Sequence, residues 1–159
     1  MSRRWSFVSR LTHGASTRLG PVVVLGGRAQ AWLLLRTDGR IGRRFFGARV
    51  FVLEVVGRRS GTLRQVPLLY VENGDGWAVL AANGGNARPP AWWLNLRAAG
   101  RGHVVLGPRR VEVDAREATP EEHGRLFAAL VANYPPVADY AGYTDRRIPV
   151  VILTRTVAP

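Results

Sequence analysis

The hydrophobic pattern from residue 50 onwards is typical of short β-strands. Residues 50–56, VFVLEVV, are β-branched and almost continuously apolar, as in a buried strand. Residues 109–117 alternate apolar and polar side chains, which predicts a strand with one solvated face. The sequence NGDG at 73–76 is strong hairpin chemistry. The predicted strands are 50–56, 64–72, 77–82, 103–107, 109–117 and 148–154.

Two helices are predicted between the strands. Residues 119–134 have apolar side chains at helical spacing, with Thr119 as N-cap, Pro120 at the first helical position and Glu122 completing a capping box. Residues 89–99 begin with a proline pair and continue with an apolar run. Six short strands with helices between pairs predict an α+β fold, a small closed or half-open β-barrel of mostly antiparallel strands with flanking helices.

The first 49 residues have a different character, because arginines alternate there with aromatic residues and glycines. An apolar run at 28–36 predicts a short helix. We expect residues 1–49 to form a basic helical segment and residues 50–159 the barrel, within a single domain overall. Basic and aromatic residues together suit peripheral contact with an anionic membrane. A helix packed across the mouth of the domain, with a solvated arginine face, explains the same pattern, and both interpretations stay open.

Residues 2–8, SRRWSFV, faintly resemble a twin-arginine export signal. The apolar region that should follow is interrupted by Arg10, Arg18 and Arg28. No run approaches the roughly 20 apolar residues that span a bilayer. We therefore expect a cytoplasmic protein, with a peripheral position at the inner face of the plasma membrane as the open alternative.

The charge balance narrows the class of partner. All 23 basic residues are arginine, against 11 acidic residues, for a formal net charge of +12. Such a balance attracts phosphate, an acidic cofactor or a lipid surface, although a GC-rich coding sequence gives the same composition. The chain has no cysteine, and its three histidines stand at no metal-type spacing. We expect no metal site.

Several common catalytic motifs are missing from the sequence. It contains no GxGxxG after a strand, no GxxxxGK followed by serine or threonine, and no GxSxG nucleophile elbow. An enzyme with this sequence would borrow its reactive group from a cofactor.

The sequence GRRSGTLR at 57–64 is the first candidate for a binding site. It places Arg58, Arg59 and Arg64 in and just after a predicted turn between two strands. Guanidinium forks beside the free N–H groups of a turn bind phosphate or carboxylate in bidentate fashion. The alternative interpretation is a hairpin tip with solvated arginines.

Three features further along the chain favour a site for a flat ring. LAANGG at 80–85 ends a strand with small residues, which lets a ring approach the backbone closely. Trp92 or Trp93 could wall a planar cofactor, with Asn95 as a polar contact, although single tryptophans belong more often to the core. Residues 134–146 carry three tyrosines on a proline-broken segment.

GRRSGTLRQVPLLYV, AANGG, PAWWLNL, residues 113–122 and YPPVADYAGYTDRRIPVVIL together resemble the deazaflavin-dependent nitroreductase family. These are split-β-barrel oxidoreductases that use coenzyme F420. The resemblance runs from about residue 50 to residue 154, in order and with short gaps only. It implies a split β-barrel with F420, in its reduced form F420H2, as the cofactor.

The resemblance also implies a set of cofactor-binding positions. Family members hold the coenzyme's phosphate and oligoglutamate tail with a loop of glycine, two basic residues, serine and glycine, followed by an arginine. Some members have serine and lysine where this chain has Ala82 and Asn83. The matching positions are Arg58, Arg59, Ser60 and Arg64 for the tail, Val66, Pro67, Leu80, Ala81, Ala82 and Asn83 along the ring, and Ala91, Trp92, Trp93, Leu94 and Asn95 in the helix that closes over it.

The expected reaction is hydride transfer from F420H2 to a quinone or another electrophilic small molecule. Tyr140, and secondarily Tyr134, is the candidate catalytic residue, as a hydrogen-bond donor to the acceptor oxygen. Nitro-reducing members have a tyrosine-cluster residue where this chain has Val137, which leaves nitro compounds in doubt as acceptors. The sequence does not fix the oligomeric state.

Three alternatives stay open. A related barrel could hold the deazaflavin or a lipid-like ligand without efficient turnover. An FMN-type reductase of the same barrel class is the nearest enzymatic alternative, but the acidic tail of F420 is what requires three arginines together. Nucleic-acid binding is the weakest, because the tryptophans belong to an apolar helix and not to an exposed stacking face. We expect no nucleic-acid partner.

Overall fold

The computed structural model describes residues 10, 20–42, 44, 45 and 47–156, so the SRRWSFV motif lies outside the described residues. The helices and strands in chain order are α2 (Gly20–Arg36), β1 (Arg44–Phe45), β2 (Ala48–Val56), β3 (Leu63–Asn73), β4 (Gly76–Leu80), the 3-10 helix η1 (Asn83–Gly85), α3 (Ala91–Ala99), β5 (Arg101–Leu106), β6 (Arg109–Glu117), α4 (Pro120–Asn133), α5 (Val137–Tyr140), the 3-10 helix η2 (Ala141–Tyr143) and β7 (Val150–Arg155).

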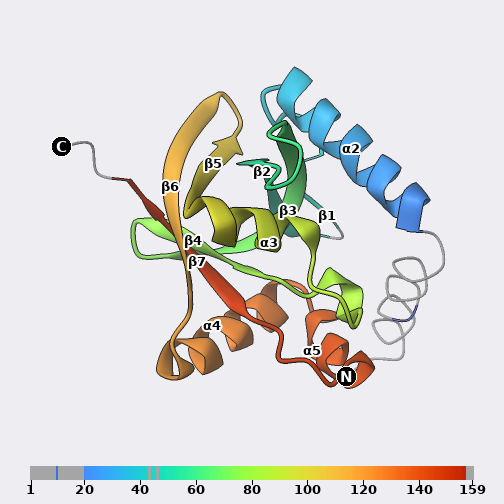
Figure 1. Cartoon of the computed structure of the whole chain (residues 1–159), viewed down its shortest axis with the longest axis vertical. Coiled ribbons are helices and arrows are strands. Elements are labelled where there is room, and N and C mark those ends of the chain that lie inside the picture. The colour runs from blue at the N-terminus through green and yellow to red at the C-terminus, as the bar shows by residue number, and fades with distance from the viewer. Residues whose placement is uncertain (1–9, 11–19, 43, 46, 157–159) are drawn as a thin grey trace.

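Six of the strands close into an antiparallel barrel (Figure 1). Their order is β2-β3-β4-β7-β6-β5, and β5 pairs back onto β2 through Val52, Leu53 and Glu54. The short β1 pairs with the first two residues of β2, Ala48 and Arg49. This confirms the predicted barrel of antiparallel strands with flanking helices, and each predicted strand corresponds to one strand of the barrel.

The alternation of side chains along β2 separates two hydrophobic layers. Phe51, Leu53 and Val55 point into the barrel, where Phe51 stacks on Tyr70 with ring centroids 4.9 Å apart. Val50 and Val52 point outward and are covered by α2. Both faces of β2 are covered, which explains why its sequence is an almost continuous apolar run.

α2 is longer than the sequence predicts. It begins at Gly20 and continues through Gly26 and Gly27, whereas only residues 28–36 were expected to be helical. Its contacts explain the difference, since a Cβ at Gly27 would lie 3.9 Å from the Pro67 ring. Ala31 and Leu34 are buried one and two turns further on. α2 therefore crosses β3 and β2 along the outside of the barrel (Figure 1). Within the described residues, no helix is both long and apolar enough to cross a bilayer.

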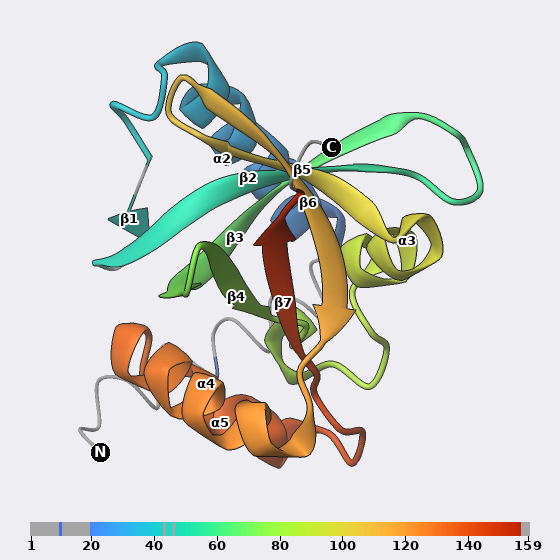
Figure 2. The ribbon, with the colours of Figure 1, turned by 90° about the vertical axis from the view of Figure 1, so that its left-hand side faces the viewer.

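α4 forms as its capping signals predict. The Thr119 hydroxyl accepts a hydrogen bond from the Glu122 N–H at 3.4 Å, and the Glu122 carboxylate accepts one from the Thr119 N–H at 2.9 Å. Leu126 and Leu130 then pack on the outer face of β4 and β7, and α5 follows directly (Figure 2). This arrangement places the C-terminal turn of α4 and all of α5 beside β3 and the end of β4.

β3 changes partner half-way along its length. Its first half, residues 63–69, pairs with β2, and its second half, residues 70–73, pairs with β4. Within the described residues, no strand pairs with the other edge of 63–69, and Pro67, which has no N–H to donate, lies on that stretch. The barrel is therefore open between the first half of β3 and the chain that follows β4.

Candidate functional site

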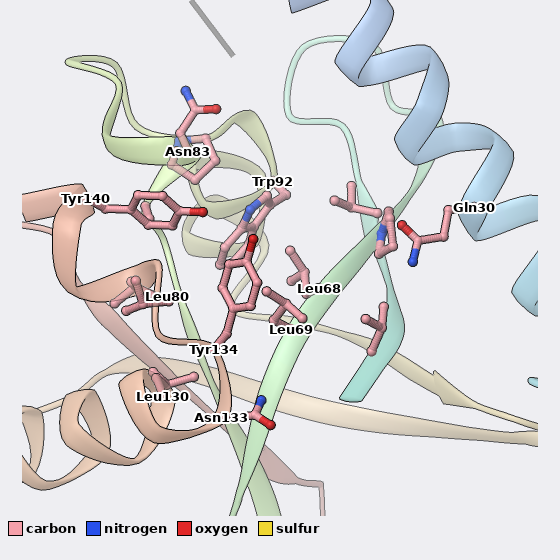
Figure 3. A pocket seen from close by; sticks show the side chains of 17 residues that line it. Gln30, Leu68, Leu69, Leu80, Asn83, Trp92, Leu130, Asn133, Tyr134 and Tyr140 are labelled. Carbon is pink, nitrogen blue, oxygen red and sulfur yellow. The ribbon is translucent and has the colours of Figure 1, made fainter. Parts of the chain in front are cut away.

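A cavity of about 350 Å³ lies at this opening (Figure 3). Its lining is mainly apolar with a few polar groups, and in size and composition it is typical of small-molecule sites. Every element around the opening contributes to the lining. The lining residues are Gln30 of α2, Val50 of β2, residues 66–69 of β3, Leu80 of β4, Ala82, Asn83 and Gly84 after it, Pro90 and Trp92 at the start of α3, Leu130, Asn133 and Tyr134 at the end of α4, and Val137 and Tyr140 of α5.

Two tyrosines supply the hydroxyl groups of the cavity. Tyr134 ends α4 and Tyr140 ends α5, and their hydroxyls point toward the same space beside Trp92 (Figure 3). Burial, together with the neighbouring Tyr140 hydroxyl, raises the pKa of Tyr134 well above its usual value. Tyr134 is therefore protonated at neutral pH. Asn133 is fixed one residue earlier by a hydrogen bond to the Tyr70 carbonyl at 3.1 Å.

The GRRSG sequence forms the tip of the β2–β3 hairpin, which projects beyond the barrel beside α3 (Figure 2). The turn is closed by hydrogen bonds between Gly57 and Thr62 and between Gly57 and Gly61. The Ser60 hydroxyl contacts the Thr62 hydroxyl at 2.8 Å and accepts a hydrogen bond from Arg64 at 3.2 Å. Ser60 thus holds Arg64 alongside the turn, which confirms the predicted position of these residues between two strands.

Arg58 is held by Asn95, which lies on the buried face of α3. The Asn95 side-chain oxygen accepts the Arg58 backbone N–H at 3.3 Å and its guanidinium at 2.9 Å. The Arg59 side chain makes no hydrogen bond or ion pair with any described residue. None of the ion pairs in the described part of the chain involves Arg58, Arg59 or Arg64. The turn therefore presents positive charge that no acidic side chain neutralises there.

One turn of α3 connects this basic loop to the cavity. Trp92 and Asn95 stand three positions apart, so they lie on the same face of the helix, and both are buried. β3 makes the same connection, because Arg64 belongs to the loop and Val66 lines the cavity. The site is thus an apolar cavity with tyrosine hydroxyls at one end and a basic loop at the other.

The sequence-predicted residues divide into three groups by position. Those that line the cavity are Val66, Pro67, Leu80, Ala82, Asn83, Trp92, Tyr134 and Tyr140. Those that form or fix the basic loop are Arg58, Arg59, Ser60, Arg64 and Asn95. The remaining four are Ala81 and Trp93, which are buried in the barrel core, Leu94, which is half-buried, and Ala91, which is exposed.

Sequence reasoning missed several lining residues. Leu130 belongs to the apolar pattern of the predicted helix 119–134 and Asn133 lies outside that pattern, so neither was assigned to a site. Gln30 interrupts an apolar run, and this was the available signal that α2 faces something other than solvent. Leu68 and Leu69 look like ordinary strand residues, and only the change of partner along β3 exposes them to the cavity.

A six-stranded barrel that opens at one seam, with an apolar cavity there and a cluster of unneutralised arginines beside it, is an arrangement suited to a small anionic ligand. Residues 26–155 match the family described as F420H(2)-dependent quinone reductase. The chain belongs to this family, and it is an F420H2-dependent reductase with F420 as its cofactor. This confirms the expected class of enzyme and its cofactor.

Individual relatives agree with the family match. An F420H(2)-dependent quinone reductase of Mycobacterium tuberculosis (strain ATCC 25618 / H37Rv) is 35% identical over 123 residues, which cover 75% of this chain and 83% of that protein. The solved structure of an F420-H2 dependent reductase, FDR-A, is 35% identical with a TM-score of 0.60, covering 65% of this chain and 92% of that one. A second solved structure, a domain-swapped dimer, is 31% identical with a TM-score of 0.63, covering 84% and 98%.

Proposed function

We propose that the protein transfers a hydride from F420H2 to a quinone, or to another electrophilic small molecule, inside the cavity at the opening of the barrel. The observation that carries this proposal is the continuity between the basic loop and the cavity along the buried face of α3. A cofactor with a flat head and a long acidic tail matches both ends of this surface. FMN, which has a phosphate but no oligoglutamate, would leave part of the arginine cluster without a partner.

The tail of the cofactor would be held by Arg58, Arg59, Ser60 and Arg64. Three guanidinium groups without an acidic partner in the described part of the chain suit a phosphate followed by several carboxylates. Asn95 supports this role, because it fixes Arg58 without neutralising its charge.

The flat head would lie in the cavity between Trp92 and the strand residues opposite. Val66 and Pro67 on β3, with Leu80, Ala82 and Asn83 at the end of β4, offer the small and apolar surface that a ring requires. Ala81, Ala91, Trp93 and Leu94 do not line the cavity, and we assign them the indirect role of supporting these walls.

The deazaflavin supplies the hydride when it is bound. The chain's own residues orient the acceptor, exclude water and stabilise the charge that develops on the acceptor oxygen. Tyr140 donates a hydrogen bond to that oxygen. Tyr134 stays protonated at neutral pH and interacts with the Tyr140 hydroxyl, so it holds Tyr140 in the orientation for donation.

A quinone is the acceptor class that the surroundings favour. The relatives are named quinone reductases, and a flat apolar ring with carbonyl oxygens suits a cavity of leucines, valines and tyrosine hydroxyls. Val137, which lies between the two tyrosines in the sequence, also lines the cavity, and its side chain has no hydroxyl. Because nitro-reducing members have a tyrosine-cluster residue at this position, we expect nitro compounds to be poorer acceptors than quinones.

A spectral titration of the purified protein with F420 and with FMN tests the cofactor assignment. We expect saturable binding of F420 and no comparable binding of FMN. Binding of FMN alone would identify an FMN-type reductase. Oxidation of F420H2 by menadione then tests turnover, and tight F420 binding without reduction of any quinone or nitro acceptor would favour a non-catalytic binding protein.

We further propose that the protein works in the cytoplasm with α2 resting on an anionic membrane. Leu25 and Trp32 are 67% and 59% exposed on the outer face of α2, and Arg28 and Arg36 flank them on the same face. Apolar and basic groups on one exposed helix face suit a lipid surface. Cosedimentation with anionic vesicles should fall when Leu25 and Trp32 are both changed to glutamate, and unchanged cosedimentation would contradict the contact.

A further inference from the structure

Arg146 lies behind one wall of the cavity and is held almost entirely by backbone carbonyls. Its Nη2 donates to the Ala81 carbonyl at 3.0 Å and to the Ala82 carbonyl at 2.7 Å, and its Nε donates to the Asn86 carbonyl at 3.0 Å. No described acidic side chain forms an ion pair with it. Burial lowers its pKa, but an arginine remains charged at neutral pH.

The three carbonyls enclose a tight bend of the chain. Asn83, Gly84 and Gly85 have φ values of 52, 62 and 76°, three successive left-handed residues. The other side of this bend is packed against the tyrosine segment, because a Cβ on Gly85 would lie 2.7 Å from the Tyr140 carbonyl oxygen. Arg146 therefore fixes the wall of the cavity in relation to Tyr140.

The same contacts, together with a hydrogen bond from the Gly85 N–H to the Ala82 carbonyl at 3.0 Å, fix which way two peptide groups face. All described peptide bonds are trans, so the N–H of each peptide points opposite to its carbonyl. With the carbonyls of Ala81 and Ala82 bound to Arg146, the N–H groups of Ala82 and Asn83 point away from it. Ala82 and Asn83 line the cavity, whereas Arg146 does not. We therefore take these two N–H groups to face the cavity.

We infer that Arg146 is a positioning residue that gives this wall a positive potential and makes the cavity prefer the electron-rich reduced form of the deazaflavin head to its oxidised form. The inference rests on the proposed function, because it takes the flat head to occupy the cavity. The oriented N–H groups and the fixed guanidinium behind them both stabilise the extra electron density of the reduced head. They are already in position, so no rearrangement is needed. Arg146 acts through the two peptides and does not touch the ligand.

A purely structural role of Arg146 would give a different result. Arg146 would then hold the wall in place for both redox forms of the head, so its loss would weaken the binding of both to the same degree. The ratio of the two dissociation constants is therefore the informative quantity. This ratio does not depend on the acidic tail, because it can be measured with the oxidised and reduced forms of the tail-less head.

The test uses Arg146→Met, which keeps an apolar stem and loses the donors and the charge, and Arg146→Lys, which keeps the charge without the planar fork. Arg147→Met is the matched control, because the Arg147 side chain is exposed and its one contact among the described residues is a 3.7 Å ion pair with Glu117. The Arg147 carbonyl, which accepts a hydrogen bond from Arg146, is kept in this variant. Each variant is titrated with the oxidised tail-less head and, anaerobically, with the reduced one. Thermal unfolding and circular dichroism identify the folded variants.

We expect Arg146→Met to weaken binding of the reduced head about tenfold more than binding of the oxidised head, or about 1.4 kcal/mol. Arg146→Lys should keep part of this preference and carries the test if Arg146→Met does not fold. Arg147→Met should leave the ratio at the wild-type value. If folded Arg146→Met and Arg146→Lys both show the wild-type ratio of the two dissociation constants, the inference is overturned and the cofactor assignment stays intact. Absence of head binding by the wild-type protein overturns the proposed function itself.

Discussion

The Asn95 side-chain oxygen accepts two hydrogen bonds from Arg58, one from its backbone N–H at 3.3 Å and one from its guanidinium at 2.9 Å. A neutral amide thereby fixes the residue at both ends without cancelling its charge. The pairing joins the hairpin tip to the helix that walls the cavity.

Changing Asn95 to aspartate separates geometry from charge. Aspartate keeps the acceptor oxygen and adds a negative charge beside Arg58, so we expect stability near that of the wild type but weaker binding of tailed F420, by about tenfold. Binding of the tail-less head should not change. Asn95→Ala should instead lower the free energy of unfolding by about 1–2 kcal/mol, because the Arg58 donors lose their partner. Equal affinity of the aspartate variant and the wild type for tailed F420 would contradict the role of Arg58.

Replacing Arg58 and Arg59 together by alanine tests the tail site directly. We expect binding of long-tailed F420 to weaken by about a hundredfold, at about 1–3 kcal/mol for each charge-assisted contact. The tail-less head should bind as before, and the salt dependence of F420 binding should become shallower. Arg40→Ala with Arg109→Ala removes the same charge from exposed positions outside the site. Equal losses for tailed coenzyme and head would return Arg58 and Arg59 to a general structural role.

Tyr140→Phe removes the proposed donor to the acceptor while leaving the ring that packs in the cavity. We expect kcat for menadione reduction to fall by about a hundredfold, as for other oxyanion donors, at roughly 3 kcal/mol. Tyr134→Phe should have a smaller effect. Tyr143→Phe is the control, because Tyr143 is half-buried and does not line the cavity. Normal turnover by Tyr140→Phe would remove this tyrosine from the mechanism.

The raised pKa of Tyr134 predicts a loss of stability in alkali. The folded protein binds the phenolic proton more tightly than the unfolded chain, whose tyrosine pKa is 10.0. The stabilisation is therefore complete below pH 10 and declines as pH rises toward the folded pKa. Between pH 10 and 11 the free energy of unfolding should fall by up to about 1.4 kcal/mol for this group. Tyr134→Phe should remove that share, measured by urea unfolding at several pH values, and an identical pH profile for both proteins would refute the assignment.

Glu54 predicts a second pH effect at the opposite end of the scale. It is buried, and burial alone would raise its pKa, but hydrogen bonds from Arg110 at 2.7 Å and Gln65 at 2.9 Å hold the pKa below 4.5. Its stabilisation is thus present above pH 4.5 and is lost as pH falls through the folded pKa. Arg110→Ala should cost about 2 kcal/mol at pH 7, less than for a fully buried pair because Arg110 is 53% exposed. Acid unfolding of Arg110→Ala should begin at a higher pH than acid unfolding of the wild type. Arg109→Ala, the control, should unfold at the wild-type pH.

Local signals in the sequence account for most of the fold. The capping residues Thr119 and Glu122 fix the start of α4, and the turn residues at 73–76 fix the β3–β4 hairpin, because both act over a few neighbouring residues. The early part of α2 was missed for a physical reason. Gly26 and Gly27 disfavour a helix locally. The packing of Ala31 and Leu34 against β2 overrides this preference, and it is a tertiary contact that local propensity does not show.

The candidate site was only partly accessible to sequence reasoning. Arg58 and Asn95 were both singled out, but nothing in a single sequence indicated that they contact each other across 37 positions. Gln30 and Asn133 reach the cavity because of tertiary packing, which composition and periodicity do not encode. Arg146 was not singled out, since three of its four carbonyl partners come from a loop about sixty residues earlier.

The change of partner along β3 has a consequence for how this scaffold can diversify. The opening is set by which backbone groups pair with β2 and which with β4, and not by the size of any side chain. On the proposed function, substitutions at Leu69, Leu130 or Val137, which line the cavity, should alter which molecules are accepted while the entrance itself persists. Closing the entrance would require extending the β3–β4 ladder, so acceptor preference and barrel architecture are free to vary independently.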